Sequence, residues 1–558
     1  MTILPINLLS AMVVIYQPAL DEYFSERINE QVLKRGSRHL LVRLEKRLDL
    51  SKLEKDCRGY HHQEGCGAKP THSIERYVRA LLVKYLYNWS YRETEERIQN
   101  DLIVKWFVGY EVLEEVLDHS GLCLFEQWVT EHHPRLFFDF ILSQIDRDFP
   151  EERGGVQIGD TFAMEANAAQ ESVVGILRHT SRLMLGELEQ GAGKQYQNMV
   201  TQIDRQRLFG PKSEPGSYWL DKEQRKLRLE NTVREGWALI QKVKACLPDL
   251  EDPLRRRIEY RLEDLEKVIR DEFELTLDAS GKLEQIVQLD EKHKGSYRLC
   301  SATDPEATCR NHGGDQTVGY NVGLLITPHA VIREISAATG AQPDQAGIAP
   351  IIKEQLDQQG VCPDVLIYDR AAGSGAVRAE VAQVSHGQTL VVANIPPPTA
   401  QGRFSPADFH LNEAGALVCP QQRTTSSHHR SSDRDGEHYT FSAKCCAACP
   451  LWEKCRDPKA SPKGERKVFL SDYQDEIRQA QAYNQTPTFK QQMKLRPFVE
   501  RVIFMLTNYD GARRARRRGL KCADFLAKMT AMARNLRTWL KLCEHKASQS
   551  GPSVSQSA

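Results

Sequence analysis

The chain has 558 residues, of which 41% are hydrophobic and 27% are charged, and its formal net charge is zero. This length exceeds one compact domain, and the composition is typical of folded proteins and not of disordered ones. Because no run of about 18 apolar residues occurs, the sequence predicts no membrane span. No basic residue precedes the apolar stretch from Ile3 to Tyr16, so we expect a packed N-terminal segment there and no signal peptide.

The first region, residues 1–150, shows helical periodicity. Apolar residues recur at intervals of three and four positions in VLKRGSRHLLVRLEKRL and in SIERYVRALLVKYLYNWSYRETEERI. This spacing is typical of amphipathic helices, which bury one apolar face. We therefore predict an all-α domain over residues 1–150.

The pattern changes at Val156 to short β-rich runs, which we assign to residues 151–177 and 291–398. VQIGDTF, DVLIYD and TLVVANIP predict single strands, and VGYNVGLLIT with AVIREISAA predicts a hairpin. PDQAGIAPIIKEQLDQQG and GSGAVRAEVAQ have helical periodicity between these strands. The resulting order of elements predicts an α/β fold with a mixed sheet.

A long charged stretch, residues 178–290, interrupts this sheet region. Segments such as DPLRRRIEYRLEDLEKVIRDEF combine a high charge density with helical spacing. We interpret the stretch as a helical hairpin inserted without disturbing the sheet. Since charge-rich helices usually present a solvated face, we favour a spacer arm, and direct contact with DNA is the alternative.

Residues 399–470 are polar and rich in turns, and they contain clustered cysteines. Thiolates are preferred ligands of structural Zn²⁺, and clustered cysteines in an intracellular protein more often bind metal than form disulfides. A zinc ion would stiffen a polar insertion that has few apolar residues. Reduced cysteines in a loop are the alternative, and His428, His429 and His438 are alternative ligands. The zinc ligands that we predict are Cys419, Cys446, Cys449 and Cys455.

Residues 471–545 return to helical spacing and are strongly basic. Between Arg496 and Lys541 the chain has twelve Lys or Arg and three acids. Five arginines in six positions cannot all pair within the chain, so a DNA phosphate backbone is the expected partner and a solvated helix turn is the alternative. We expect residues 546–558 to be a disordered tail. The predicted DNA-binding residues are Arg496, Arg513, Arg514, Arg516, Arg517, Arg518, Arg534 and Arg537.

Three acids far apart in the sequence form a candidate catalytic set. Asp160 and Asp369 each close an apolar β run, and Glu500 follows Arg496 by one helical turn. A carboxylate at the end of a strand faces the crevice where α/β sheets bind ligands. Carboxylate oxygens are preferred by Mg²⁺ and Mn²⁺, and a pair of such ions supports in-line phosphoryl transfer. Each acid taken alone is more simply a helix cap or a surface ion pair.

Several motifs together resemble the DDE transposases of bacterial insertion sequences. Asp160 with the following Glu165-Ala166-Asn167 is similar to the first acidic motif of that family, and YDRAAGS around Asp369 is similar to the second. SATDPEA before GYNVGLLIT resembles the approach to the second and third core strands. RPFVE, GARRARRRGL and MARNLRTWL resemble the Glu-bearing region, and VLDHSGLCLFEQWV resembles an N-terminal motif.

The chain departs from the family pattern at four positions. Ala371 and Ala372 stand where Gly and Tyr are common after the second Asp. Met493 and Thr507 stand where related transposases often have a Tyr before the Arg and a Lys after the Glu. The departures concern the expected contacts with phosphate, whereas the three acids themselves are retained.

The resemblance implies an RNase H-like mixed-sheet core with an N-terminal all-α domain for DNA-end binding or dimerisation, a helical insertion and a Cys-rich, zinc-ribbon-like insertion. It implies strand cleavage at the ends of an insertion sequence and transfer of the freed 3′-hydroxyl into target DNA. Asp160, Asp369 and Glu500 would hold two Mg²⁺ or Mn²⁺ ions.

The implied partners are double-stranded DNA and further copies of the chain, in a homodimer or larger assembly in the bacterial cytoplasm at the nucleoid. Two alternatives stay open. One is an RNase H-like nuclease without strand transfer, and the other is an inactive zinc-containing DNA-binding protein.

Overall fold

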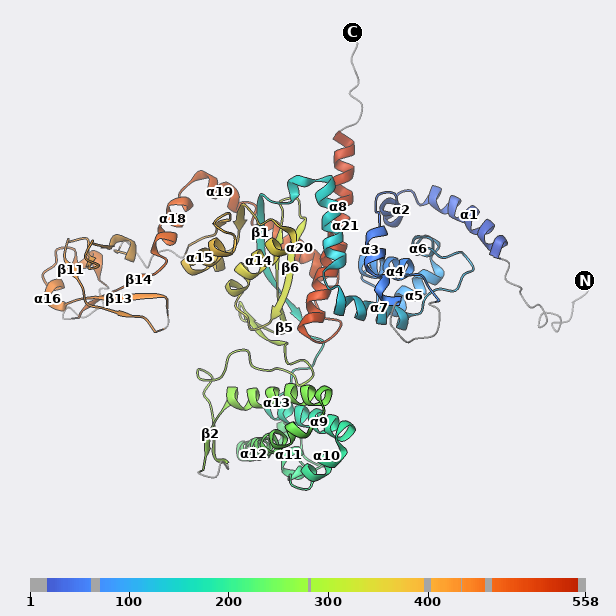
Figure 1. Cartoon of the computed structure of the whole chain (residues 1–558). Helices are drawn as coiled ribbons and strands as arrows, with labels where there is room; N and C mark the ends of the chain where they lie inside the picture. Colours follow the sequence, from blue (N-terminus) through green and yellow to red (C-terminus); the bar gives the residue numbers. More distant parts are fainter. Residues whose placement is uncertain are drawn as a thin grey trace, which may run out of the picture. The chain divides into compact units, whose positions relative to one another are not determined.

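The computed structural model describes residues 18–61, 71–278, 283–395, 403–432, 434–456 and 464–549 (Figure 1). The apolar stretch 3–16 and the tail beyond residue 549 lie outside this part of the chain. The chain divides into two compact units. The first contains Met1–Pro150, Tyr509–Gly511 and Lys528–Ala558, and the second contains Glu151–Asn508 and Ala512–Ala527.

The first unit is helical, as the spacing of its apolar residues predicted. Helix α4 is buried along most of its length and carries Lys84, which pairs with Glu126 of α7 at 2.7 Å. Both side chains are almost completely buried, so loss of either would remove the ion-pair partner of a charge in the interior. The helices up to residue 148 are α1 (Pro18–Arg35), α2 (Leu40–Glu45), α3 (Ser51–Asp56), α4 (Ile74–Leu86), α5 (Tyr91–Asn100), α6 (Leu102–Val108), α7 (His119–His132) and α8 (Leu136–Asp148).

A six-stranded mixed sheet forms the centre of the second unit. Its order is β4-β5-β1-β7-β8, and β6 also pairs with β5. β1 runs antiparallel to β5 and parallel to β7, while β5 and β6 form the hairpin that the sequence predicted. The mixed α/β character of this region is therefore confirmed. The strands are β1 (Val156–Glu165), β4 (Thr308–His312), β5 (Asp315–Ile326), β6 (Ile332–Thr339), β7 (Val365–Ile367) and β8 (Leu390–Val392).

Two helices in the connections between strands build a hydrophobic core against this sheet. α14 (Ile348–Gln359) links β6 to β7, and α15 (Gly375–Val384) links β7 to β8. Their apolar residues pack with Leu325 and Tyr368. Gly159 of β1 lies against the ring of Tyr368, where an added Cβ would stand 2.4 Å from a ring carbon. No residue with a side chain fits there without a shift of that ring.

The charged stretch after β1 is a packed subdomain, whereas the sequence predicted a helical hairpin. It contains five α-helices and a two-stranded hairpin in its described part. The apolar residues of its helices, such as Leu188, Ile240 and Leu265, form a hydrophobic core of their own, and most of the charged residues lie outside it. The elements are α9 (Val173–Gly191), α10 (Gly193–Val200), α11 (Arg205–Phe209), α12 (Lys222–Cys246), α13 (Asp252–Glu272), β2 (Phe273–Leu277) and β3 (Leu283–Gln288).

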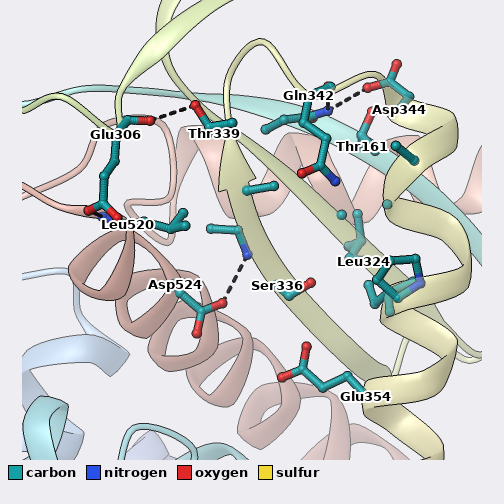
Figure 2. Close-up of a pocket in the computed structure, with 18 of the residues that line it drawn as sticks. Thr161, Glu306, Leu324, Ser336, Thr339, Gln342, Asp344, Glu354, Leu520 and Asp524 are labelled. Carbon is teal, nitrogen blue, oxygen red and sulfur yellow. Dashed lines mark hydrogen bonds between the residues drawn. The ribbon is translucent and has the colours of Figure 1, made fainter. Parts of the chain in front are cut away.

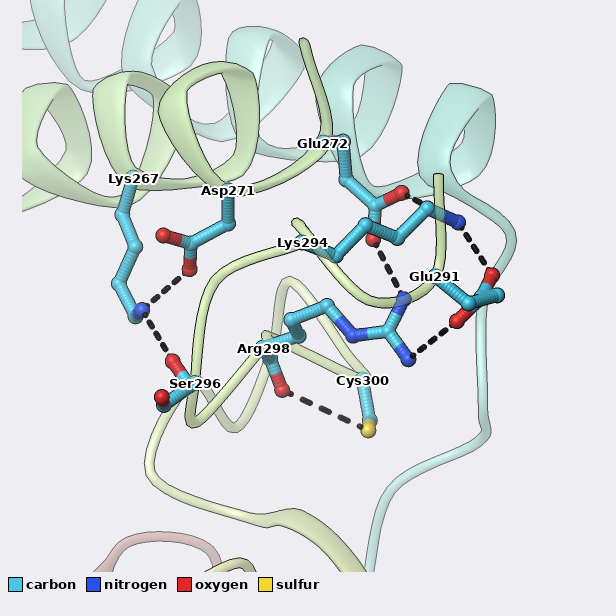
Figure 3. Close-up of polar contacts among 8 residues, drawn as sticks. All are labelled: Lys267, Asp271, Glu272, Glu291, Lys294, Ser296, Arg298 and Cys300. Atoms are coloured by element: carbon cyan, nitrogen blue, oxygen red, sulfur yellow. Dashed lines mark hydrogen bonds and ion pairs between the residues drawn. The ribbon is translucent and has the colours of Figure 1, made fainter. Parts of the chain in front are cut away.

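A network of ion pairs fastens the chain where it leaves this helical subdomain (Figure 3). Glu272 at the end of α13 pairs with Lys294 at 3.1 Å and with Arg298 at 3.1 Å. Glu291 pairs with the same two cations, at 2.6 Å and 3.4 Å. Because Glu272 is only 8% exposed, its pairs are screened less by solvent than ordinary surface pairs. The network holds the segment after β3 against the end of α13.

The Cys-rich region also has a small core, formed by Phe409, Leu417, Tyr439, Phe441 and Val468. It contains two three-stranded sheets, with the orders β11-β10-β9 and β12-β13-β14. The elements are β9 (His410–Leu411), β10 (Leu417–Val418), β11 (Thr424–Thr425), β12 (His428–Arg430), β13 (Gly436–Phe441), α16 (Ala443–Cys446), α17 (Trp452–Cys455) and β14 (Arg466–Ser471).

The C-terminal part is helical, as predicted, with α18 (Gln474–Asn484), α19 (Pro487–Met493), α20 (Pro497–Asn508) and α21 (Leu520–Gln549). The residues of α21 belong first to the second unit and then to the first. Among the residues that the structure describes, no helix combines the length and apolar character needed to cross a membrane.

Candidate catalytic site

Asp160 lies in the middle of β1, opposite Leu324 of β5. The sequence predicted that it would close the strand, but the pairing continues to Glu165. Its Oδ1 accepts a hydrogen bond of 2.9 Å from the backbone N–H of Thr161, and its side chain is 17% exposed. Since successive strand residues point to opposite faces, the side chains of Asp160 and Thr161 lie on different faces of the sheet.

Asp369 follows β7, and its side chain accepts a hydrogen bond of 2.8 Å from the backbone N–H of Ala371. This bond caps the 3-10 turn Arg370–Gly373. In the parallel pairing of β1 with β7, Ile158 lies opposite Ile367. Asp160 and Asp369 each lie two residues beyond that pair, so they reach the same level on adjacent segments of chain. Parallel pairing at this register brings two acids separated by 209 residues to the same place.

Helix α20 packs against β1, and Arg496, just before this helix, contacts both Asp160 and Glu500. Arg496 donates from Nη2 to Oδ2 of Asp160 at 2.9 Å and from Nη1 to Oε1 of Glu500 at 3.3 Å. The Glu500 side chain is 65% exposed, so it lies at the solvent side of this arrangement. One guanidinium group thus bridges two of the three candidate acids, and its Nη2 ion pair with Asp160 is largely shielded.

The electrostatics of Asp160 reflect this crowding. Burial raises the pKa of Asp160 above its usual value, and the nearby charge of Asp369 raises the pKa further. The charge of Arg496 and the N–H of Thr161 act in the opposite direction without reversing the shift. The ionised carboxylate is therefore disfavoured here, and an additional positive charge would stabilise it.

No group of three His, Cys, Asp or Glu side chains within the described ranges is arranged to hold a metal ion. The donor chemistry of the three acids nevertheless suits a hard divalent cation, because all their ligand atoms are carboxylate oxygens. The guanidinium of Arg496 is the cationic group that contacts two of them in this structure. In chemical character, the acidic set fits a divalent cation.

A cavity of about 820 Å³ lies near the same strands, but on the face to which Thr161 points (Figure 2). Arg310 of β4 donates to Thr161 at 2.9 Å and to Asp344 at 3.1 Å. Burial acts to raise the pKa of Asp344, but hydrogen bonds from Asn321 and Thr161 and the charge of Arg310 hold that pKa below its usual value. Sequence reasoning missed this network, whose only signal was polar residues in or beside predicted strands.

The basic segment Ala512–Gly519, which we call the arginine loop, is docked on the end of β1. Glu165 donates its backbone N–H to the carbonyl of Arg513 at 2.9 Å, and its own carbonyl accepts from Ala515 at 2.8 Å. The side chain of Asn167 donates to the carbonyl of Arg516 at 2.9 Å. Residues of the Glu165-Ala166-Asn167 motif therefore position the backbone of the arginine loop.

The SATDPEA motif holds the other end of the arginine loop. Asp304 is buried and accepts hydrogen bonds from the hydroxyl of Tyr320 at 2.6 Å and from the N–H of Gly519 at 3.3 Å. The Glu306 carboxylate accepts a hydrogen bond of 2.8 Å from the backbone N–H of Leu520, which is the first residue of α21. Sequence reasoning gave this motif no physical role, because its partners Gly519 and Leu520 lie more than 200 residues away.

The arginine loop turns part of its charge to solvent. Arg513, Arg514 and Arg518 are exposed, and Arg516 and Arg517 are half-buried. The guanidinium of Arg513 is 70% exposed and lies 3.5 Å from the carboxylate of Glu165. Ion pairs between exposed groups contribute little to stability, so this one leaves Arg513 available to a stronger anion such as phosphate.

Arg534 and Arg537, also predicted to bind DNA, instead have internal partners in the first unit. Arg534 pairs with Asp510, and their side chains are only 11% and 5% exposed. Arg537 donates to the carbonyl of Leu86, and burial lowers the pKa of its guanidinium. Helical spacing put both on α21, but tertiary packing turns them inward. We therefore leave these two arginines out of the DNA-contacting set.

The four predicted zinc ligands gather near the small core of the Cys-rich region, against which Cys419, Cys446 and Cys455 pack. Burial raises the pKa of the Cys446 and Cys455 thiols, which opposes the thiolate form that a metal needs. Within the described ranges these cysteines, Cys449 included, do not form a metal-holding group. His429 and His438 stack on each other across β12 and β13. The prediction of a zinc site is thus not supported by this structure.

Comparison with known families gives two matches, both to transposase domains. A transposase domain family (DUF772) matches residues 29–128, within the helical first unit. A transposase DDE domain family matches residues 418–540, which include Arg496, Glu500 and the arginine loop. No curated protein matches the chain in sequence. The class of protein is accordingly a transposase.

The order of the two matched domains agrees with the family motifs in the sequence, and the chain is recognised as an insertion-sequence DDE transposase. This class acts in DNA transposition, and its members generally use divalent metal ions such as Mg²⁺. Asp160 and Asp369 lie outside both matched ranges, so their roles depend on the geometry of the sheet.

Proposed function

We propose that the chain cleaves DNA strands at the ends of an insertion sequence and joins the freed 3′-hydroxyl to target DNA. The proposal assigns the catalytic acids as Asp160, Asp369 and Glu500, on an RNase H-like sheet formed by β1 and its neighbours. The observation that carries it is the bridge of Arg496 between Asp160 and Glu500, beside the register that aligns Asp160 with Asp369.

In this proposal the three carboxylates hold two Mg²⁺ or Mn²⁺ ions. When bound, the ions would activate the attacking hydroxyl and stabilise the leaving oxygen of an in-line displacement. The contribution of the protein is to supply fixed, partly buried oxygen ligands, since phosphoryl transfer depends mainly on positioning and electrostatics. Burial of Asp160 serves this purpose, because a dehydrated carboxylate gains more from a nearby cation.

Arg496 has a role of its own at this site. Its guanidinium contacts Asp160 and Glu500, while its buried Nε has no hydrogen-bond partner in the described part of the protein. The Arg496 side chain as a whole is 16% exposed, and a guanidinium beside two acids is suited to a phosphate oxygen of the DNA strand. We assign Arg496 to the orientation of the phosphate at the acids, with Arg513, Arg514, Arg516, Arg517 and Arg518 contacting the DNA backbone beyond.

The test of this proposal is a substitution series in the full chain. Asp160→Asn, Asp369→Asn and Glu500→Gln should each reduce Mg²⁺-dependent cleavage of DNA that carries the element ends by about 100-fold or more, since loss of a group that orients a metal ligand already costs about 10- to 100-fold. Binding of the same DNA in EDTA should stay within about twofold. Asp357→Asn, at an exposed acid on α14 paired with Lys353, is the matched control.

The reaction products distinguish the remaining functions. Joining of a labelled 3′ end to a second DNA molecule supports strand transfer, and cleavage without joining indicates a nuclease. Full activity in one of the three acid variants would remove that acid from the site. DNA binding without any cleavage in the unaltered protein would favour a DNA-binding protein without catalysis.

A further inference from the structure

The helical subdomain exposes a pair of large aromatic side chains. Tyr218 and Trp219 belong to the 3-10 turn Ser217–Trp219, between α11 and α12, and are 85% and 79% exposed. Their ring centroids are 5.4 Å apart and their planes meet at 85°. Neither ring joins the hydrophobic core of this subdomain. Two neighbouring exposed aromatic rings are unusual on a soluble surface and indicate a contact site.

The backbone that carries these rings is firmly held. Arg228 of α12 donates to the carbonyl of Pro215 at 2.7 Å, and Arg225 donates to the carbonyl of Ser217 at 3.0 Å. Glu214, at the start of the turn, pairs with Arg228 at 3.1 Å and with Arg178 of α9. The turn is therefore anchored to two helices while its rings face solvent, so presenting them costs little ordering of the chain on binding.

The surroundings of the pair are basic. A cavity of about 300 Å³ has three cations and one acid in its lining, and the acid Glu230 lies 3.9 Å from Lys226. The lining residues are Lys222, Arg225, Lys226, Leu229, Glu230, Phe273, Ile286 and Gln288. Arg225 belongs both to this cavity and to the contacts that hold the turn. Residues 205–228 contain seven Lys or Arg against three acids, so the local charge is positive although the whole chain is neutral.

We propose that Tyr218, Trp219 and this basic cavity bind unpaired bases of a DNA strand. The rings would stack on the bases, and Lys222, Arg225 and Lys226 would contact the phosphates. Every base has a flat π face, so such stacking needs no particular sequence. In a duplex the base faces are covered by their neighbours, whereas the positive charge disfavours a purely apolar protein partner. The inference adds to the proposed function a site for single-stranded DNA outside the three acids.

The test measures binding in the full-length protein by fluorescence anisotropy of a labelled twelve-nucleotide poly(dT) strand and a labelled duplex of equal length. EDTA is present throughout, so the result does not depend on cleavage. The double variant Tyr218→Ala, Trp219→Ala should weaken binding of the single strand about tenfold or more, since stacking on one aromatic ring contributes roughly 1–3 kcal/mol per base. Its affinity for the duplex should change less than twofold.

Two control variants keep the interpretation specific. Trp219→Phe retains a flat ring and should preserve most of the single-strand affinity. Tyr260→Ala removes another exposed tyrosine of the same subdomain, on α13, and should have no effect. Asp357→Asn, the control outside the three acids, should bind the single strand normally. Because binding is measured in EDTA, failure of the catalytic proposal would not change this result.

Three results would overturn the inference. They are an unchanged single-strand affinity in the double variant, an equal loss of single-strand and duplex binding, and a change in self-association by light scattering with single-strand binding intact. The last would assign the aromatic pair to a contact between proteins.

Discussion

Arg496 donates a hydrogen bond of 2.9 Å to Asp160, although 336 residues separate them. The same guanidinium reaches Glu500 one helical turn further on. This contact joins α20 to the central strand of the sheet and compensates part of the negative charge that gathers there. Changes at Arg496 should therefore alter the ionisation of Asp160 as well as the contact with DNA.

The first prediction concerns the pH dependence of activity. Arg496 opposes the rise in the pKa of Asp160 that burial causes, so Arg496→Gln should raise that pKa further. Because the ionised carboxylate is the active form in our proposal, the acid limb of the pH–rate profile for DNA cleavage should move to higher pH. Arg496→Lys keeps a positive charge and should move the limb less. If the acid limb does not move in Arg496→Gln, then Arg496 does not influence the ionisation of Asp160.

The second prediction concerns stability. The pKa of Asp160 in the folded protein lies above its reference value of 3.8, so the ionised form destabilises the native state at neutral pH. Asp160→Asn should therefore raise the melting temperature at pH 7, by an amount reduced by whatever stability the ion pair with Arg496 contributes. The gain should shrink as the pH falls through the folded pKa and should vanish well below 3.8, where Asp160 is protonated in both states. A constant difference across that range would argue against a raised pKa.

The third prediction tests the packing of β1. Gly159→Ala would place a Cβ 2.4 Å from the Tyr368 ring and 2.9 Å from Leu325, so it should destabilise the protein by about 1–3 kcal/mol in chemical denaturation. Gly186→Ala, in α9, meets no atom within 4 Å and should stabilise by up to about 1 kcal/mol. Equal effects of the two substitutions would contradict the close approach of Tyr368.

The fourth prediction concerns the arginine loop. The triple variant Arg513→Ala, Arg514→Ala, Arg518→Ala should weaken duplex binding and reduce the slope of log affinity against log salt by about 0.9 for each phosphate that the variant leaves without an arginine. The three side chains are exposed, so the melting temperature should stay nearly constant. Weaker binding with an unchanged salt slope would mean that these arginines do not contact phosphates.

The fifth prediction separates Arg534 from the arginine loop. Arg534→Ala would leave the buried carboxylate of Asp510 without its partner and should destabilise the protein by about 3–5 kcal/mol, as measured by denaturant unfolding. Arg534→Met with Asp510→Leu removes both charges and should recover much of that stability. At temperatures where the double variant is folded, it should bind DNA with the normal salt slope. A reduced salt slope of DNA binding in the double variant would mean that Arg534 contacts DNA.

Local patterns predicted the elements that depend on local spacing. The alternation in VGYNVGLLIT predicted β5, and the apolar periodicity of residues 348–359 predicted α14. The same patterns did not reveal the hydrophobic core between the charged helices α9 to α13. The sequence of a helix with one charged face has the same pattern whether the other face is solvated or packed. The dense charge favoured the wrong description of that segment.

At the candidate site too, local patterns predicted some residues and missed others. The three candidate acids stood out because their motifs are short and ordered along the chain. Arg310 of β4 and Asp344 of the 3-10 turn Asp344–Gly347 were missed because they meet only in the folded chain. Helical spacing grouped Arg534 with the arginines of the loop, although burial against Asp510 depends on contacts that spacing does not contain.

The sequence by itself determined the class of the protein and the mixed α/β character of its sheet region, and it singled out three acids as candidates. Only the tertiary structure decided that β1 and β7 pair at a register which puts Asp160 level with Asp369, and that Arg496 spans Asp160 and Glu500. The reason is physical. Local spacing fixes which face a residue occupies, but strand register and helix packing across hundreds of residues fix which residues meet.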